Sequence, residues 1–258
     1  MRDLEPFFAE LRAWSAANDP GATRHVYGTH PEQHADLRLP AGRGPQPTVV
    51  VIHGGFWRAA FTKENTTAVA IALTYRGFAT WNVEYRRVGA DGGYPATLED
   101  VRAACRLATD HAKTDAARLA VLGHSAGGHL ALWALADGAV RGAVSLAGIT
   151  DLAAAERAGI GSGAVSEFLG GIGRAQLARY RDADPISRIP TGGRSLLVHG
   201  ARDDRVPLAQ SQAFVRAAAA AGDDARLLEL ADADHLDPLD PRGAHWPAIA
   251  EAVDALLS

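Results

Sequence analysis

The sequence of 258 residues contains one cysteine, has no long hydrophobic run, and carries a formal net charge of only −4. A single cysteine, Cys105, excludes an intrachain disulfide framework and a zinc cluster built on cysteines, so we expect it in the core. No stretch is long enough to cross a membrane. The small net charge gives no indication of a surface for polyanions. We therefore expect no membrane partner and no nucleic-acid partner.

Hydrophobic residues make up 47% of the chain and charged residues 22%, as in ordinary globular proteins. We expect one large α/β domain over residues 1–258, because no second domain boundary is visible. Residues 1–14 (MRDLEPFFAELRAW) mix acidic with apolar residues, which is not typical of a signal peptide. A cytoplasmic location is the expectation, and the oligomeric state cannot be read from the sequence.

Strand-like and helix-like segments alternate along most of the chain. Apolar runs of strand length are expected at residues 48–52, 79–85, 118–122, 140–146, 195–199 and 225–230. Helical patterns are expected at residues 4–17, 66–77, 97–111, 127–136, 208–222 and 246–257. Residues 23–27 and 35–39 are expected to form a leading hairpin. This alternation predicts an α/β fold with a mostly parallel central sheet and helices on both faces.

Residues 150–190 interrupt the alternation with short helical pieces and many glycines. We predict a small cap or lid insertion there, since long irregular segments in compact domains usually serve a function. The amphipathic helix at 4–17 is expected to pack on the domain surface, and it could also border the substrate entrance. The helix at 97–111 is expected to begin with a capping-box variant formed by Thr97 and Asp100.

The segment VLGHSAGGH at residues 121–129 contains Gly123-x-Ser125-x-Gly127, the pattern of a nucleophile elbow. An apolar strand is expected before it and a proline-free helix after it. A sharp turn between strand and helix exposes a serine hydroxyl at the edge of a sheet, and the two glycines leave room for that turn. The alternative is a glycine-rich turn with an incidental serine. We predict that Ser125 is a nucleophile.

A nucleophilic serine needs backbone N–H groups that stabilise the oxyanion of the reaction intermediate. The segment HGGFW follows the strand at 48–52, and its glycine pair lets the backbone approach the reacting group closely. The amide directly after the nucleophile is expected to supply a further donor. We predict an oxyanion hole formed by Gly54, Gly55, Phe56 and Ala126.

The segment HGARDDRVP at 199–207 follows a predicted strand and supplies a candidate acid at the sheet edge. Asp203 is our choice for the carboxylate that orients a catalytic histidine. Asp204 is the adjacent competitor, and Asp151 is a third possibility. His235, in the loop after the last strand, is the predicted general base, and His245 is its rival.

Taken together, these motifs resemble the α/β-hydrolase superfamily over nearly the full chain, in particular its esterase and kynurenine-formamidase branch. The matching segments are HGGFW, GHSAGGHL, HGARDDRVP and DADH. The resemblance implies the α/β-hydrolase fold, with Ser125, Asp203 and His235 as the triad and amides of HGGFW and Ala126 as the oxyanion hole. It implies neither a metal nor an organic cofactor. A phenylalanine where longer lipase relatives have a third glycine favours the formamidase-like or small-ester branch.

Aromatic residues around the predicted elbow are candidate substrate contacts: Trp57, Tyr94 and Phe168. Arg58, Arg86 and Arg87 could bind a substrate carboxylate, or they could be ion-paired residues of the surface. The predicted activity is hydrolysis of a small carboxylic ester or of an activated amide such as an N-formyl arylamine. Acyl transfer or thioester hydrolysis with the same triad is an alternative, and a non-catalytic binding protein on this fold is another.

Overall fold

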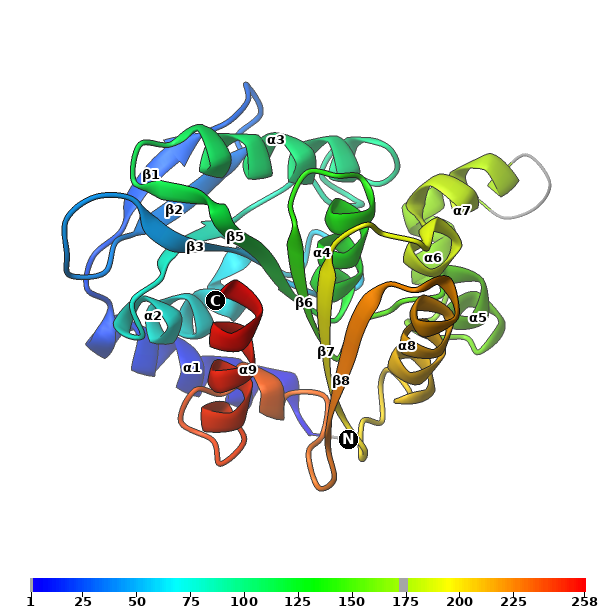
Figure 1. The fold of residues 1–258 in the computed structure, drawn as a ribbon. Coiled ribbons are helices and arrows are strands. Elements are labelled where there is room, and N and C mark those ends of the chain that lie inside the picture. Colours follow the sequence, from blue (N-terminus) through cyan, green and yellow to red (C-terminus); the bar gives the residue numbers. More distant parts are fainter. Residues whose placement is uncertain (1, 172–175) are drawn as a thin grey trace.

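The computed structural model describes residues 2–171 and 176–258 (Figure 1). Within these residues, eight strands form one sheet with the order β1-β2-β4-β3-β5-β6-β7-β8. The strands are β1 (Thr23–Val26), β2 (His34–Arg38), β3 (Gln46–Ile52), β4 (Ala79–Val83), β5 (Thr114–His124), β6 (Gly142–Leu146), β7 (Arg194–Gly200) and β8 (Asp224–Leu230). The part of the predicted cap at 172–175 lies outside the described residues.

The sheet is parallel from β4 to β8, and the leading hairpin adds two antiparallel strands at one edge. β3 and β5 lie side by side, with Val50 opposite Val121 and Ile52 opposite Gly123. Both strands are buried where they pair from Thr48 and Leu119 onward, as expected for strands covered on two faces. The loops that follow β3 and β5 therefore leave the sheet at the same edge.

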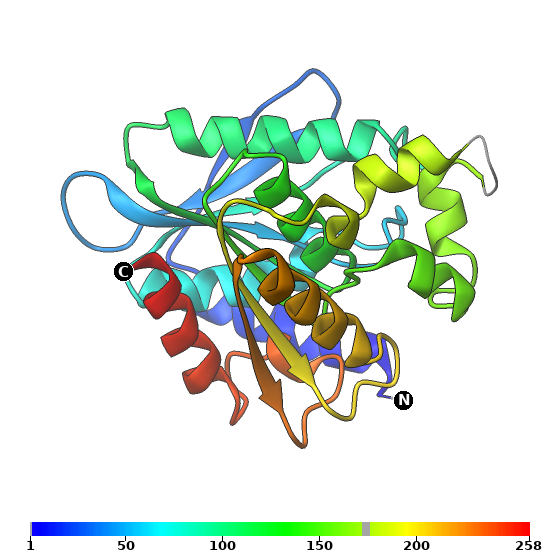
Figure 2. The ribbon, with the colours of Figure 1, turned by 45° about the vertical axis from the view of Figure 1, so that its right-hand side comes forward.

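Helices cover both faces of the sheet, which separates two apolar cores (Figure 2). One face carries α3 (Ala96–Asp110), α4 (Ala126–Ala136) and α8 (Ala209–Ala221). The other carries α1 (Leu4–Asn18), α2 (Thr67–Tyr75) and α9 (Trp246–Leu257). α4 is apolar on all sides and buried along almost its whole length, because it packs between the sheet and neighbouring helices.

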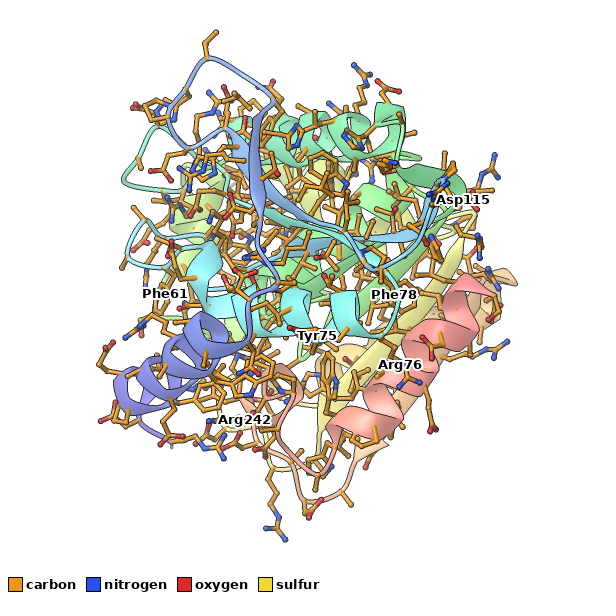
Figure 3. The ribbon with its side chains drawn as sticks, turned by 90° about the vertical axis from the view of Figure 1, so that its left-hand side faces the viewer. Phe61, Tyr75, Arg76, Phe78, Asp115 and Arg242 are labelled. Atoms are coloured by element: carbon orange, nitrogen blue, oxygen red, sulfur yellow. The ribbon has the colours of Figure 1, made fainter. Side chains whose placement is uncertain are left out.

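The end of α2 is tied to both helices that flank it (Figure 3). The hydroxyl of Tyr75 donates to the carbonyl of Asn18 at 2.8 Å, which links α2 to the end of α1. The guanidinium of Arg76 donates to Asp254 of α9 at 2.7 Å. The Tyr75 contact ties the end of α1 to α2, and α1 reaches the site described below.

Residues 150–190 contain α5 (Leu152–Arg157), α6 (Ala164–Leu169), α7 (Leu177–Ala183) and the 3-10 helix η3 (Pro185–Arg188). Figure 1 shows the three α-helices grouped beside α4 and α8. Two further 3-10 turns, η1 (Lys63–Thr66) and η4 (Asp237–Leu239), follow β3 and β8. None of the helices in the described parts of the chain is both long and apolar enough to span a membrane.

Two sequence expectations about local structure are corrected. β5 begins at Thr114, four residues before the predicted strand, because its first residues pair with Gln46 of β3 beyond a bulge. The predicted capping box of α3 is wrong, since no side chain caps this helix. Thr97 instead donates to the carbonyl of Arg86 at 2.6 Å, and Asp100 is buried against the Arg86 guanidinium.

Candidate active site

Ser125 stands between β5 and α4 on a strained backbone, with φ 55° and ψ −118°. A non-glycine residue in this region is unfavourable and persists only where the surroundings enforce it. The Ser125 amide donates to the carbonyl of Leu146 at 2.8 Å, which anchors the turn to β6. A β-carbon on Gly123 would lie 2.0 Å from the Gly127 carbonyl oxygen, so this close turn requires glycine. The structure therefore has the sharp strand-to-helix turn predicted from the sequence.

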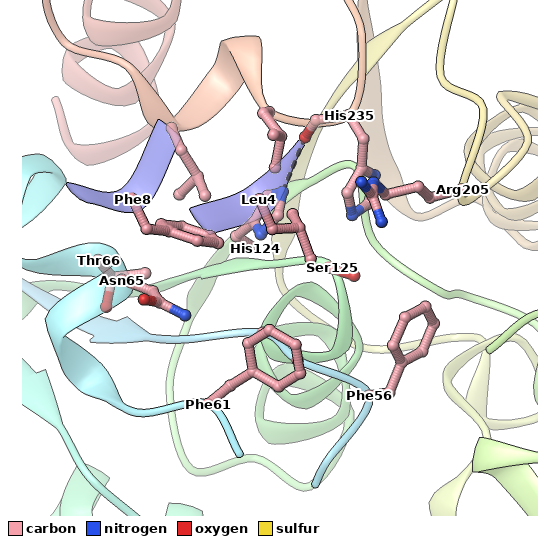
Figure 4. A pocket seen from close by; sticks show the side chains of 14 residues that line it. Leu4, Phe8, Phe56, Phe61, Asn65, Thr66, His124, Ser125, Arg205 and His235 are labelled. Carbon is pink, nitrogen blue, oxygen red and sulfur yellow. Dashed lines mark hydrogen bonds between the residues drawn. The ribbon is translucent and has the colours of Figure 1, made fainter. Parts of the chain in front are cut away.

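His235 and Asp203 form a direct hydrogen bond, with 2.7 Å between His235 Nδ1 and Asp203 Oδ2. Because Nδ1 faces a carboxylate, it carries the proton, and Nε2 is left as the acceptor. His235 and Ser125 line the same cavity (Figure 4). No hydrogen bond joins these two side chains in the described part of the chain, and catalytic contacts often tighten only around bound substrate.

The Asp203 carboxylate is held by several donors besides His235. Its Oδ1 accepts from the amides of Arg205 and Val206 at 2.9 and 2.8 Å, and its Oδ2 lies 3.2 Å from His199 Nε2. Burial works to raise the pKa of this carboxyl, but hydrogen bonds from His199 and His235 hold it well below its usual range. Asp203 is therefore charged at neutral pH and can accept the hydrogen bond from His235 Nδ1.

The structure places the competing residues in other environments. Asp151 is the N-cap of α5, where its side chain accepts from the amide of Ala154 at 2.7 Å. His245 precedes α9, and its Nε2 lies 3.4 Å from Asp232. Neither residue lines the cavity of Ser125. Asp204 is the next residue in the chain, and the 2.7 Å contact to His235 is made by Asp203.

The predicted oxyanion residues lie next to Ser125. Gly54 approaches so closely that a β-carbon there would be 2.9 Å from Ser125 Cβ and 2.6 Å from the His124 carbonyl oxygen. Among the described residues, no hydrogen bond from the amides of Gly55, Phe56 or Ala126 to a protein acceptor is found. Ala126 is the first residue of α4, where amides lack partners within the helix. These amides are available to a negatively charged oxygen.

A buried polar pair supports the loop that contains Gly54. His53 Nδ1 lies 2.7 Å from the Gly54 carbonyl oxygen, and His53 Nε2 lies 2.9 Å from Glu84 Oε1. Tyr85 stacks on the His53 ring at 4.4 Å between centroids. Burial works to raise the pKa of Glu84, but the hydrogen bond from His53 lowers it below its usual value. The charged Glu84 side chain, which directly follows β4, therefore holds the turn after β3 in place through His53.

The cavity beside Ser125 is mostly apolar and encloses about 410 Å³, including the part open to solvent. Its wall is formed by residues from five regions of the chain: Leu4, Phe8, Gly54, Gly55, Phe56, Phe61, Asn65, Thr66, His124, Ser125, Arg205, His235, Leu236 and Leu239. Figure 4 shows phenylalanine rings around the space that the serine faces.

The predicted aromatic substrate contacts are not in this wall. Trp57 and Phe168 are 0% and 1% exposed, and their rings stack at 4.7 Å inside the core. Both side chains therefore lie outside the cavity wall, and their role as substrate contacts stays a prediction. Tyr94 lies elsewhere, with its amide bonded to the Phe168 carbonyl at 2.7 Å and Arg179 over its ring. The rings of Trp57 and Phe168, which the sequence suggested as ligand contacts, instead pack in the core near α4 and α6.

The aromatic residues that do form the wall include Phe61 and Phe8, which sequence reasoning did not select. Phe8 belongs to α1, so this helix, which was expected to pack on the domain surface, also forms part of the cavity wall. The signal was available in the helical spacing of apolar residues, but the same spacing is typical of a helix that packs only on a core. Phe61 lies in a loop, where periodicity gives no information.

The three arginines suggested as carboxylate ligands are ion-paired within the protein. Arg58 donates to Glu167 at 2.7 Å, and Arg86 donates to Asp100 at 2.7 Å. Arg87 contacts Glu84 at 3.2 Å. Arg205, which was not selected from the sequence, is the arginine in the cavity wall.

The predicted cap segment touches the oxyanion loop. Gly161 has φ +70°, and a β-carbon there would lie 2.4 Å from the Phe56 ring. Arg58, two residues along the loop, also donates to the carbonyl of Gly161 at 3.0 Å. The segment therefore fixes one side of the cavity, while its opening as a lid stays a prediction.

Comparison with known proteins identifies a family for most of the chain. The BD-FAE family model matches residues 35–217. Esterase LipC of Mycobacterium tuberculosis is 29% identical over 281 residues, which cover 92% of this chain and 67% of LipC. These matches agree with the esterase side of the predicted resemblance, and the kynurenine-formamidase side stays a prediction.

Solved structures agree with the predicted fold. A bifunctional GH43-CE protein of Bacteroides eggerthii matches with a TM-score of 0.79 and 23% identity, over 91% of this chain and 38% of that one. Esterase 2 of Thermogutta terrifontis, in a form phosphoramylated by tabun, matches with a TM-score of 0.76 and 21% identity, over 92% of this chain and 94% of that one. The predicted α/β-hydrolase fold is confirmed.

Proposed function

This chain belongs to the BD-FAE family of α/β-hydrolase-type esterases, and we propose that it is a serine hydrolase that cleaves small carboxylic esters. The observation that carries the proposal is the 2.7 Å hydrogen bond between His235 and Asp203 at the cavity that Ser125 shares. An oriented imidazole beside a serine on a strained elbow is the arrangement that activates a hydroxyl as a nucleophile.

In the proposed reaction, Ser125 Oγ attacks the ester carbonyl carbon while its proton passes to His235 Nε2. The carbonyl oxygen becomes an oxyanion held by amides of the Gly55–Phe56 loop and of Ala126. The intermediate collapses, the alcohol leaves with the proton from His235, and an acyl-enzyme remains. Water then attacks that acyl group by the same steps and releases the acid.

Asp203 supports both stages. Its charge stabilises the imidazolium that forms when His235 holds the serine proton, and the 2.7 Å contact fixes the ring orientation. Both stages of the proposed reaction consume only substrate and water. The activated-amide substrate, the acyl-transfer reaction and the non-catalytic reading are alternatives with the same site, and a cytoplasmic location stays a prediction.

The test compares initial rates on p-nitrophenyl acetate, p-nitrophenyl octanoate and N-formylkynurenine for wild type and Ser125→Ala. We expect Ser125→Ala to fold normally and to lose at least about 1,000-fold in kcat, because removal of one triad member has effects of this order. Ser258→Ala, at an exposed terminal residue, is the matched control and should keep wild-type rates. Retained turnover in folded Ser125→Ala protein would contradict the proposal.

Labelling by a fluorophosphonate probe separates an enzyme from a binding protein. We expect labelling of Ser125 in wild type and none in Ser125→Ala. A preference for the formamide over both esters would place the activity in the formamidase class. Faster acyl loss on addition of an alcohol than in water alone would indicate an acyltransferase.

A further inference from the structure

Arg205 brings a positive charge into a mostly apolar cavity. Its side chain lines the same space as Ser125 and His235 (Figure 4). Leu236 and Leu239 belong to the same wall. The backbone amide of Arg205 donates to Asp203 Oδ1 at 2.9 Å. This bond fixes the start of the Arg205 side chain relative to the predicted catalytic acid.

Most of the Arg205 guanidinium is unused by the protein. A guanidinium offers five N–H donors in a planar fork. One of them donates to the Arg2 carbonyl at 2.7 Å. Among the ion pairs formed by residues 2–171 and 176–258, none contains the Arg205 side chain, whereas Arg58 and Arg86 each have a carboxylate.

The acidic side chains of the neighbouring histidine loop are engaged elsewhere. Asp234 and Asp237 lie 3.4 and 3.1 Å from the guanidinium of Arg2. Asp203 is bonded to His235, as described above. A cation in an apolar wall is stabilised when an anion pairs with it, and a carboxylate matches the fork of a guanidinium with two parallel hydrogen bonds.

The side of the cavity indicates which half of an ester would meet Arg205. Arg205 is bonded to Arg2, and Arg2 is paired with Asp234, the neighbour of His235. Arg205 and His235 bind the same carboxylate, since the Arg205 amide donates to Asp203 Oδ1 and His235 Nδ1 contacts Asp203 Oδ2, so both residues lie on the Asp203 side of the cavity. In the proposed reaction, His235 delivers a proton to the departing alcohol, so that alcohol lies at this end.

We propose that Arg205 binds a carboxylate on the alcohol half of the substrate, so that the preferred esters carry a negative charge near the scissile bond. The inference rests on the proposed esterase function of the same site. It makes Arg205 a specificity residue. An ion pair with Arg205 would hold the leaving group against His235. It would contribute little to the cleavage of neutral esters.

The experiment measures kcat/KM for 3-acetoxybenzoate and for 3-acetoxybenzamide, which has a similar size and no charge, each divided by its uncatalysed hydrolysis rate. Arg205→Gln should lower the value for the anionic ester by about 10- to 100-fold, since hydrogen bonds to charged groups contribute on this scale. The neutral ester should change by less than about threefold on the same scale. Arg205→Lys should retain part of the preference, and Arg226→Gln, at an exposed arginine, should retain all of it.

Equal losses on both esters, or an unchanged rate on the anionic ester, would overturn the proposal. A charge on the acyl half is tested with p-nitrophenyl hemisuccinate against p-nitrophenyl butyrate, and an effect of Arg205→Gln confined to this pair would overturn the placement. Thermal unfolding of each variant checks that the fold is retained.

Calorimetry separates failure of this inference from failure of the esterase proposal. Ser125→Ala protein should bind 3-acetoxybenzoate at least about 10-fold more tightly than 3-acetoxybenzamide, and the added Arg205→Gln change should abolish the difference. This result would support the inference even if neither ester were turned over. Equal binding of the two compounds would overturn it even in an active esterase.

Discussion

Nε2 of His199 lies 3.2 Å from Oδ2 of Asp203, the same oxygen that His235 contacts at 2.7 Å. His199 is itself fixed, since its Nδ1 lies 2.7 Å from Ser211 Oγ and its Nε2 lies 2.8 Å from the Val206 carbonyl oxygen. β7 therefore supplies both the acid's loop and a residue that orients the acid. The contact with His199 restricts rotation of the Asp203 carboxylate and keeps Oδ2 directed at His235.

Asp203→Asn should reduce kcat by about 1,000- to 10,000-fold while leaving the fold intact. The new amide can present a donor to His235 Nδ1, which favours the wrong tautomer and removes the charge that stabilises the imidazolium. Steady-state kinetics on p-nitrophenyl acetate measure the loss, and circular dichroism checks the fold.

Asp204→Asn is the matched control for that substitution. It changes the adjacent carboxylate in the same loop and should leave kcat within about threefold of wild type. A larger loss of kcat for Asp204→Asn than for Asp203→Asn would reverse the assignment of the acid.

Gly54→Ala should lower kcat by at least about 100-fold, comparable to loss of one oxyanion donor. The added β-carbon would lie 2.6 Å from the His124 carbonyl oxygen and 2.9 Å from Ser125 Cβ, so the loop must move away from the elbow. Overpacking of this kind also destabilises a protein by about 1–3 kcal/mol. Kinetics and urea unfolding measure the two effects.

Gly138→Ala separates stability from catalysis. Gly138 follows α4 with φ +76° and has open space around it, so alanine there strains the backbone without touching the site. We expect a loss of stability of about 1 kcal/mol and unchanged kcat. If Gly54→Ala and Gly138→Ala both lost activity in proportion to their loss of stability, the close approach of Gly54 to Ser125 would have no specific role in catalysis.

The free energy of unfolding should fall as pH is lowered below about 6.5, partly through His129. Burial lowers the pKa of His129 to about 4. Its Nδ1 accepts from Trp57 Nε1 at 3.3 Å and its Nε2 faces the Ala183 carbonyl oxygen at 2.8 Å, so the folded protein holds it neutral. Between those two pKa values the unfolded chain binds a proton that the folded protein does not, which favours unfolding by up to about 3 kcal/mol.

Urea unfolding at pH 7.5 and pH 4.5 measures this effect. His129→Gln should lose about 1–3 kcal/mol less than wild type on acidification, whatever its stability at pH 7.5. Burial also lowers the pKa of His124, to about 3, and this adds to the acid sensitivity of both proteins. Burial raises the pKa of Asp184 to about 6. This shift opposes the acid sensitivity, because the folded protein then binds a proton more readily than the unfolded chain does. An equal loss in both proteins would exclude His129 as a contributor.

Local patterns were sufficient to predict the elbow and the order of elements. Gly123, Ser125 and Gly127 lie within five residues, so the turn depends on contacts between near neighbours in sequence. The alternation of apolar strands and amphipathic helices likewise predicted the parallel sheet, since each pattern reflects burial of one segment on its neighbours. The expected ends of strands were less accurate where pairing extended a strand, as at Thr114.

The choice among neighbouring polar residues was not determined by sequence. Asp203, Asp204 and Asp151 all follow strands at the same sheet edge, and only side-chain direction in the folded protein places one of them against His235. Arg58 was suggested as a carboxylate ligand from the sequence and Arg205 was not, but Arg58 meets Glu167 across the fold whereas Arg205 lines the cavity.

The sequence by itself therefore determined the fold class and the strand-turn-helix that presents Ser125, because both arise from patterns that are local along the chain. Tertiary structure decided which aromatic rings meet the cavity. Trp57 is buried against Phe168, whereas Phe8 from α1 and Phe61 from a loop form the wall. Packing between segments far apart in sequence made these choices, since the burial of each ring depends on partners that no local pattern identifies.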